Sequence, residues 1–338
     1  MATLGNSVLT LSDWAKKLDP DGKVAITVEI LEQTNMILEG MMFKEGNLPT
    51  GEQTTIRTGL PAVFYRKMNM GTPKSKSRTV QITENAASLT ARAEVDVKIA
   101  RLNGNVAAFR LDEGQAFVEA MGQQQATTLL YGTAANPEEF EGFIPRFNDL
   151  SAPNAENILD AGGTGSDNAS VLLVGWGART VFGVFPKGSK AGISHQDLGE
   201  IDAFDENDDR FRAFADLWEW DNGLVVKDWR YVVRIANIDI PDLEAQATSQ
   251  APTAATALIK LMSRSIDRIP NTTSSKLEFY ANRSVLSLLR VAALDKSQNA
   301  VTIEAGLDQF GKTIHRMSFL GIPVKLTDAL VNNEARVV

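Results

Sequence analysis

Residues 54–98 constrain this chain most, because they combine strand patterning with little material for a core of their own. Between Gly71 and Arg78 the sequence has the glycine, proline, serine and lysine residues of an exposed turn. On both sides of that turn, apolar residues alternate with polar ones, the period of a strand with one dry face. These apolar residues are Ile56, Val80, Ile82, Val95 and Val97. An isolated hairpin is marginal in water, so the sequence predicts a long hairpin supported by a neighbouring subunit.

The same segment differs in charge from the remainder of the chain. It contains eight basic and three acidic residues, a net charge of +5, whereas the whole chain carries −8, which leaves −13 on the other residues. A basic extension on an acidic body favours head-to-tail contact between copies. We therefore predict self-association through this segment.

Composition excludes several classes of protein. The 338 residues, 43% hydrophobic and 22% charged, suffice for one large or two ordinary globular domains. The absence of cysteine excludes disulfides, thiolate catalysis and cysteine-ligated metals. No apolar run approaches the roughly 20 residues that cross a bilayer, and the first residues lack the pattern of a secretory signal. A pI near 5.0 argues against tight nucleic-acid binding through a broad basic face.

The remaining sequence predicts an N-terminal helical region, one long helix and a mixed α/β half. Helices are expected after Ser12 and over residues 23–38, and the long helix over 110–131, where Gly132 ends it. Residues 136–165 are rich in loop-forming residues. Further strands are expected at 170–176, 180–185, 224–226, 230–235, 277–280, 314–319 and 322–326, and further helices at 253–269 and 283–294.

Patterns for catalysis or metal binding are poorly matched. The two histidines, His195 and His315, lie outside any motif and are interpreted as ordinary polar residues. The acidic run from Glu200 to Asp209 has some spacings of a calcium loop, but Arg210 stands at the required glycine. We interpret the run as a solvated loop that can dock a basic partner, and we expect no catalytic residue, metal or cofactor.

Two other functional classes remain open at this level. A hydrolase-type enzyme would combine an Asp or Glu with His195, and it requires a deep pocket that joins the histidine to a carboxylate. A carbohydrate- or nucleic-acid-binding module would use the tryptophan cluster between Trp218 and Trp229, and it requires exposed indole faces. Neither class accounts for the unsupported basic hairpin.

Four strings occur in a characteristic order along the chain. They are LSDWAKKLDPDGK at 11–23, GNLPTG at 46–51, FPKGSKAG at 185–192 and DWRYVVRIANI at 228–238. Together with the order of elements, they resemble the major capsid proteins of tailed bacteriophages, which have the Hong Kong ninety-seven-type fold shared with herpesvirus shells. Within that group the strings are similar to the epsilon-fifteen-like short-tailed phages. The resemblance covers essentially the whole chain, and its weight lies in the number and order of the strings.

The resemblance implies an α+β phage major capsid fold. Its parts would be an N-terminal arm over 1–50, an extended β-hairpin loop over 51–100, a peripheral domain over 101–168 with a spine helix at 110–131, and a mainly axial domain of mixed α/β structure over 169–338. Later strands would return to the peripheral sheet, and residues 229–238 are one candidate. Because the arm before the hairpin is short, scaffolding is expected to be a separate protein.

The implied function is structural, not enzymatic. Copies of a major capsid protein would assemble into pentamers and hexamers of an icosahedral shell that encloses double-stranded DNA without sequence-specific binding. The implied partners are the chain itself and scaffolding, portal and decoration proteins, with no membrane. The implied location is the virion, after assembly in the host cytoplasm.

Charged residues in the hairpin and elsewhere are the predicted contacts between subunits. They would meet at a partly wet rim, where opposite charges set register and orientation. The basic set is Arg66, Lys67, Lys74, Lys76 and Arg78, and the acidic set is Glu138, Glu139, Glu141, Asp205, Asp208 and Asp209.

Overall fold

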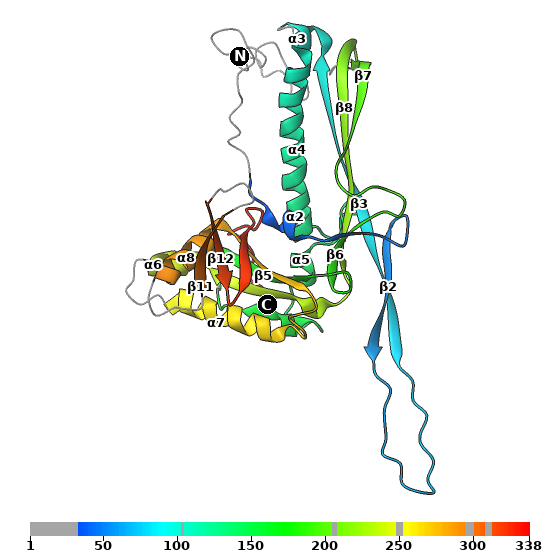
Figure 1. Cartoon of the computed structure of the whole chain (residues 1–338), viewed down its shortest axis with the longest axis vertical. Coiled ribbons are helices and arrows are strands. Elements are labelled where there is room, and N and C mark those ends of the chain that lie inside the picture. Colours follow the sequence, from blue (N-terminus) through cyan, green and yellow to red (C-terminus); the bar gives the residue numbers. More distant parts are fainter. Residues whose placement is uncertain (1–32, 103–104, 205–207, 248–252, 295–300, 308–312) are drawn as a thin grey trace.

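The computed structural model has three visible parts: a body, an upright layer and a projecting arm (Figure 1). It describes the chain except for residues 1–32, 103–104, 205–207, 248–252, 295–300 and 308–312. The upright layer is a long helix beside long strands. The arm continues these strands beyond the body, away from the end that lies beside the helix. Within the described ranges, no helix is both long enough and apolar enough to span a bilayer.

One long strand, β3 (Arg78–Asp96), connects the arm to the upright layer. Its residues 78–85 pair with β2 (Gly51–Gly59), and its residues 86–96 pair with β8 (Arg210–Val226), both antiparallel. The strand therefore changes partner half-way along. The first half forms the arm together with β2, and the second half forms part of the upright layer (Figure 1).

Helix α4 (Val106–Tyr131) and strand β7 (Ser194–Phe204) complete the upright layer. The helix begins after Asn105, whose side-chain oxygen accepts a hydrogen bond from the backbone N–H of Ala108 at 3.2 Å, an N-cap. The short helix α3 (Val97–Arg101) precedes it. β7 pairs antiparallel with β8, and α4 lies beside the strands of this layer (Figure 1).

The body is a mixed sheet flanked by helices. Its strands are β1 (Phe43–Glu45), β4 (Ile158–Asp160), β5 (Asn168–Trp176), β6 (Val181–Phe185), β9 (Val232–Asp239), β10 (Lys276–Ala281), β11 (Val301–Leu307), β12 (Thr313–Phe319) and β13 (Ile322–Leu326). Its helices are α2 (Met36–Gly40), α5 (Phe143–Arg146), α6 (Ile240–Ala247), α7 (Thr253–Arg268) and α8 (Arg283–Leu294), with 3-10 turns η1 (Ala155–Asn157) and η2 (Trp229–Tyr231). Among the described residues the strand order is β11-β12-β13-β10-β5-β6-β8-β3-β2, so one sheet runs from the body into the arm.

The largest hydrophobic core lies in the body. All nine residues of β5 are buried, as a continuous apolar strand between β10 and β9 requires. A charged network crosses this core. Arg234 is 1% exposed and donates to Glu334 Oε2 at 2.9 Å, and Tyr131 at the end of α4 donates to Glu334 Oε1 at 2.6 Å. This network ties the C-terminal residues and the long helix to the body.

Several predicted elements are confirmed. The long helix is present and ends at Tyr131 as expected, although it begins at Val106 and not at residue 110. The helix at 283–294 has the predicted bounds, and the strands at 170–176, 277–280 and 322–326 differ by two residues or fewer at each end. Of the two N-terminal helices, the first lies outside the described residues, and only Met36–Gly40 of the second region is described as helix.

The predicted turn of the hairpin is too short. The strands end at Gly59 and begin again at Arg78, so the connecting segment is 60–77 and not 71–78. Pro61 and Pro73 lack the N–H that a ladder needs, and the register between β2 and β3 shifts between Arg57 and Gly59. The arm is therefore a short ladder that carries a long connection.

The acidic run is not the loop that we expected. Glu200 and Asp202 lie in β7, and the expected short strand at 224–226 is the end of the long strand β8. An extended strand from Arg210 onwards does not wrap a calcium ion. Asp216, further along that strand, accepts a hydrogen bond from Arg110. Beside α4, strand β8 pairs with β3, and β7 pairs with β8. Residues 232–239, in β9, instead pair with β4 and β5 of the body.

Candidate assembly interface

The tip of the arm, residues 60–77, exposes an unusual amount of apolar surface. Its side chains contact little else in the chain; one hydrogen bond, from Ser75 Oγ to the Ala62 carbonyl at 2.7 Å, crosses it. Clustered exposed apolar side chains mark surfaces that another molecule covers. Each of the following is at least 52% exposed: Leu60, Val63, Phe64, Tyr65, Met68 and Met70.

The strands of the arm are also uncovered. Ile56 lies opposite Val80 in the ladder, on the face that the alternating pattern predicts to be dry. Within one chain, Val80 remains 50% exposed and Ile82 37% exposed. The described part of the same chain covers this face at Ile56, near the body, and leaves it open at Val80 and Ile82, where a second molecule can lie against it.

Two partly buried ion pairs hold the base of the arm. Arg146 donates to both carboxylate oxygens of Glu84, each at 2.7 Å, which links β3 to α5. Lys227 donates to Glu52 Oε1 at 2.8 Å, and the backbone N–H of Asn47 donates to Glu52 Oε2 at 2.9 Å. One pair anchors each strand of the arm, so the arm leaves the body in a defined direction.

The ionisation of these groups follows from their contacts. Burial alone would raise the pKa of Glu52, but the hydrogen bonds from Lys227 and Asn47 hold that pKa below its ordinary value. Burial opposes the charge of Arg146, and the Glu84 carboxylate outweighs it, so the pKa of the guanidinium is raised. The Glu52 carboxylate and the Arg146 guanidinium are therefore charged at neutral pH.

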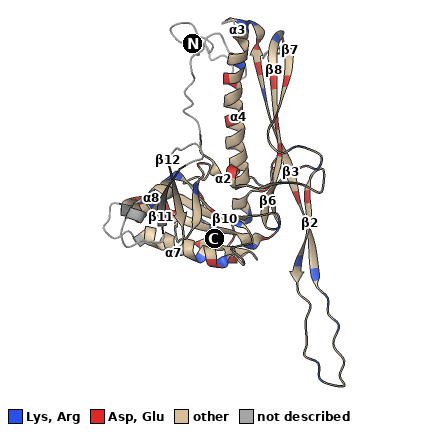
Figure 2. Cartoon of the chain, viewed as in Figure 1, with Lys and Arg blue, Asp and Glu red and all other residues tan. Residues whose placement is uncertain are grey.

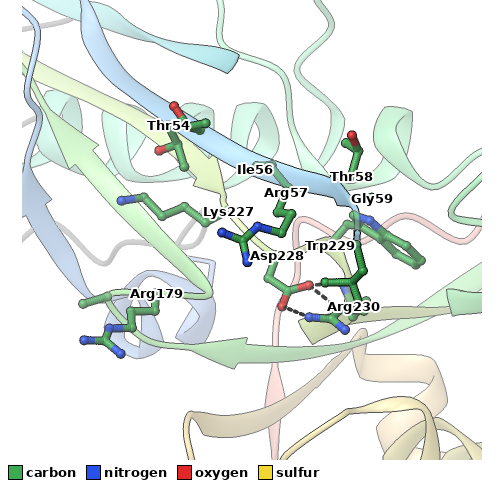
Figure 3. Close-up of a pocket in the computed structure, with 13 residues that line it drawn as sticks. Thr54, Ile56, Arg57, Thr58, Gly59, Arg179, Lys227, Asp228, Trp229 and Arg230 are labelled. Carbon is green, nitrogen blue, oxygen red and sulfur yellow. Dashed lines mark hydrogen bonds and ion pairs between the residues drawn. The ribbon is translucent and has the colours of Figure 1, made fainter. Parts of the chain in front are cut away.

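A cleft of about 810 Å³ lies between β2 and the body; its lining is residues 54–60, 178–179 and 227–230. Figure 3 shows the charged ends of Arg57, Lys227 and Arg179 around this cleft, with Asp228 and Arg230 joined beside them. Arg230 makes two hydrogen bonds to Asp228, at 2.9 and 2.7 Å. The lining is therefore basic overall.

The structure places the basic set on the arm and leaves it without ion pairs. Arg66, Lys67, Lys74 and Lys76 lie exposed in the tip, and Arg78 is the exposed first residue of β3. Among the described residues, none of these five forms a salt bridge, so their charges are available to another molecule.

The acidic set lies away from the tip. Glu138 and Glu139 follow α4, and Glu141 lies 3.6 Å from Arg146. Asp208 and Asp209 lie just before β8, while Asp205 falls outside the described residues. Figure 2 shows other acidic residues on the strands of the upright layer, at the end of the molecule opposite the tip. Among the residues described for one chain, the two sets do not meet.

A second groove, of about 580 Å³, lies between α4 and the β7–β8 hairpin, and it joins a histidine to a carboxylate. His195 Nε2 lies 2.9 Å from Asp216 Oδ1, and the imidazole stacks on Trp218 at 5.1 Å. Asp216 also accepts hydrogen bonds from Arg110 at 3.0 and 2.7 Å. The histidine and the carboxylate named in the hydrolase alternative thus meet in this groove, and both carboxylate oxygens of Asp216 are engaged, by Arg110 and His195.

The alternative of a binding module built on tryptophans requires exposed indole faces, and Trp218 and Trp220 do not provide them. Trp218 is 6% exposed and Trp220 is 9% exposed, and both pack in the core between α4 and the strands of the upright layer. Phe117 of α4 stacks on Trp218 with ring centroids 5.4 Å apart. Within the described ranges, no group of three or more acidic or histidine side chains is arranged to hold a metal ion.

Sequence reasoning missed two parts of this interface. The apolar tip was visible as a run from Leu60 to Met70 with no pairing partner, but its exposure depends on where the strands end. The anchors Glu84–Arg146 and Glu52–Lys227 join residues 62 and 175 positions apart, and no local pattern indicates such pairs.

Comparisons with known proteins place the chain among shell-forming proteins. A family model described as major capsid protein GP7 matches residues 19–338. A chain of the bacteriophage Epsilon15 structure is 29% identical, with a TM-score of 0.76, over 100% of this chain and 99% of that chain. The bacteriophage JBD30 capsid is 10% identical (TM-score 0.47, 89% and 93% covered), and the capsid of the native GTA particle is 8% identical (TM-score 0.47, 65% and 95% covered). No curated protein matches the sequence.

Proposed function

The chain belongs to the GP7 family of phage major capsid proteins, which form the icosahedral shell of the virion, and we propose that its arm joins neighbouring subunits of that shell. Its mixed sheet and long helix are those of the Hong Kong ninety-seven-type capsid fold. The protein is therefore a structural component of the virion capsid and not an enzyme.

One observation carries the proposal for the arm: six large apolar side chains are exposed on a tip that has no core of its own. Fully burying one such side chain contributes about 1.5–3 kcal/mol before the cost of ordering the segment. After that cost, one arm contact would contribute on the order of a few kcal/mol. Weak individual contacts let misplaced subunits leave, and many contacts per subunit stabilise the closed shell.

The charged residues give this contact its orientation. In our proposal, the basic set on the arm meets the acidic set of a neighbour, as opposite charges do at a partly wet rim. Support comes from the lack of ion pairs for Arg66, Lys67, Lys74, Lys76 and Arg78 within the described part of one chain.

The finer architecture is also part of the proposal. We assign residues 1–50 to an N-terminal arm, 51–100 to the extended loop, 101–168 to the peripheral domain and 169–338 mainly to the axial domain. Strand β8 pairs with β3 beside α4, and β7 pairs with β8, which supports counting these two strands with the peripheral domain. Pentamers and hexamers of the subunit would enclose double-stranded DNA, with separate scaffolding, portal and decoration proteins.

The experiment measures particle mass by light scattering and particle shape by negative-stain microscopy. We expect closed shells or rings from the wild type, and folded subunits without shells from the charge-reversed variant Lys74→Glu/Lys76→Glu/Arg78→Glu. The charge-conserving control Lys74→Arg/Lys76→Arg/Arg78→Lys should assemble normally. Normal shells from the charge-reversed variant would refute the electrostatic role of the arm.

A further inference from the structure

We propose that the cleft at the base of the arm binds the acidic turn at Glu138 and Glu139 of a second copy of the chain. The arm would then hold its neighbour at its base as well as at its tip. This inference rests on the proposed role of the arm in assembly. It assigns Glu138 and Glu139 of the acidic set to the base of the arm, and it leaves the other members of that set to the tip.

The cleft is open on the side where a partner would enter. β2 lies at the end of the strand order in the described sheet, so its outer edge faces the cleft and not another strand. The opposite wall comes from the body, through the turn after β5 that carries Arg179 and the segment around η2 (Figure 3).

Two cations in this lining have no counter-charge. Lys227 is bound to Glu52, and Arg230 is bound to Asp228. Arg57 and Arg179, both exposed, form no ion pair with any described residue. Two guanidinium groups around one cleft repel each other, and a carboxylate between them would remove the repulsion and accept charge-assisted hydrogen bonds.

The turn after α4 has the matching charge and a fixed shape. Phe140 is 3% exposed and anchors it, and the backbone N–H of Gly142 donates to the Gly132 carbonyl at 2.8 Å. Within the turn, the N–H of Glu139 donates to the Asn136 carbonyl at 3.2 Å. A turn that is already ordered loses little entropy on binding.

Glu138 and Glu139 place two carboxylates next to each other in this ordered turn. Several other carboxylates already have a basic partner, for example Glu84 with Arg146 and Glu200 with Arg101 and Arg212. These two adjacent carboxylates form no ion pair among the described residues, and Glu138 is exposed.

Binding has to occur between two copies. Within one chain, Glu138 and Glu139 line a different cavity, together with residues 87–90 of β3 and residues of α4. None of these residues lines the cleft at the base of the arm. The cleft and the turn thus form a heterologous pair of surfaces, which builds rings of subunits when the rotation between neighbours closes.

A charge swap tests the pairing in the full-length chain. We expect Arg57→Glu/Arg179→Glu and Glu138→Arg/Glu139→Arg each to reduce shell yield by roughly tenfold or more, because like charges would then face each other. The four changes combined should restore most of the yield. Arg57→Lys/Arg179→Lys, which conserves charge, is the matched control, and circular dichroism with thermal unfolding confirms that each variant folds.

The outcomes separate this inference from the proposed role of the tip. Normal shells from either charge-reversed pair would overturn it, and so would failure of the fourfold variant to recover when both pairs are defective and folded. If the tip variant at Lys74, Lys76 and Arg78 assembles normally while the charge swap behaves as expected, the electrostatic role of the tip fails and the cleft pairing stands. Glu138→Arg/Glu139→Arg should not rescue the tip variant.

Discussion

Glu84 and Arg146 show how single residues control the direction of the arm. Their side chains are only 12% and 15% exposed, and the two hydrogen bonds between them are parallel. Such a geometry suits a planar guanidinium and holds the two groups in one orientation. A single pair of side chains thus helps to set the direction of the arm, which few other contacts support.

We predict that Arg146→Met destabilises the folded subunit by about 3 kcal/mol, the lower end of the range for breaking a buried pair, because it leaves the partly buried Glu84 carboxylate without a counter-charge. Unfolding in urea, followed by circular dichroism, measures the change. Arg230→Met is the control: this arginine is 55% exposed beside Asp228, so the loss should stay within about 1 kcal/mol. Equal losses from the two variants would contradict the structural role of the Glu84 pair.

The lowered pKa of Glu52 predicts a dependence of stability on pH. Because the folded pKa lies below the ordinary value of 4.5, the carboxylate stabilises the fold above that value. This contribution is lost as the pH falls below 4.5 and through the folded pKa. We therefore expect the free energy of unfolding to fall less steeply in Glu52→Gln than in the wild type between about pH 6 and about pH 3.5.

A second variant, Lys227→Met, tests the same ion pair from the lysine side. Removing the hydrogen bond that lowers the pKa of Glu52 should also make the pH dependence shallower. Identical slopes in the wild type and in Glu52→Gln would show that this carboxylate is not held by its neighbours in the folded state.

At the scale of elements, α4 carries two glycines in different surroundings. A methyl group on Gly122 would meet no atom within 4 Å, whereas one on Gly114 would lie 3.1 Å from Cζ2 of Trp218. Glycine in a helix interior costs roughly 1 kcal/mol relative to alanine. The two positions therefore form a matched pair for testing how α4 packs on the sheet.

We expect Gly122→Ala to stabilise the isolated subunit by about 0.5–1 kcal/mol. Gly114→Ala should gain less than that or lose stability, because the indole of Trp218 has to shift. Unfolding of the unassembled subunit in urea measures both. A larger gain at Gly114 than at Gly122 would be inconsistent with the contact between α4 and Trp218.

At the scale of the whole molecule, charge is divided between an arm with unpaired cations and a body with excess acid. Exposed charges attract over about 10 Å at 0.1 M salt and over about 3 Å at 1 M. We predict that assembly at 1 M sodium chloride needs a higher subunit concentration than at 0.1 M. Light scattering during a concentration series measures the threshold, and a threshold that falls with salt would indicate that apolar burial alone drives assembly.

Much of the local structure could be predicted, because its signals are local. The helical period over residues 110–131 and the stop at Gly132 predicted α4, and the continuous apolar run of β5 predicted a buried strand. The alternation of Ile56, Val80 and Ile82 predicted one apolar face on the arm. The order of these elements and four strings were enough to indicate the family.

The partners of each element were decided only by the tertiary structure. A strand pattern says which face is apolar but not which strand lies alongside, so the exchange of β2 for β8 along β3 had no signal in the sequence. The same holds for the anchors at Glu84 and Glu52 and for the cleft beside Arg57 and Arg179, whose residues are brought together from distant positions. The sequence determined that an extended basic arm exists, and long-range pairing determined where it points and what lies at its base.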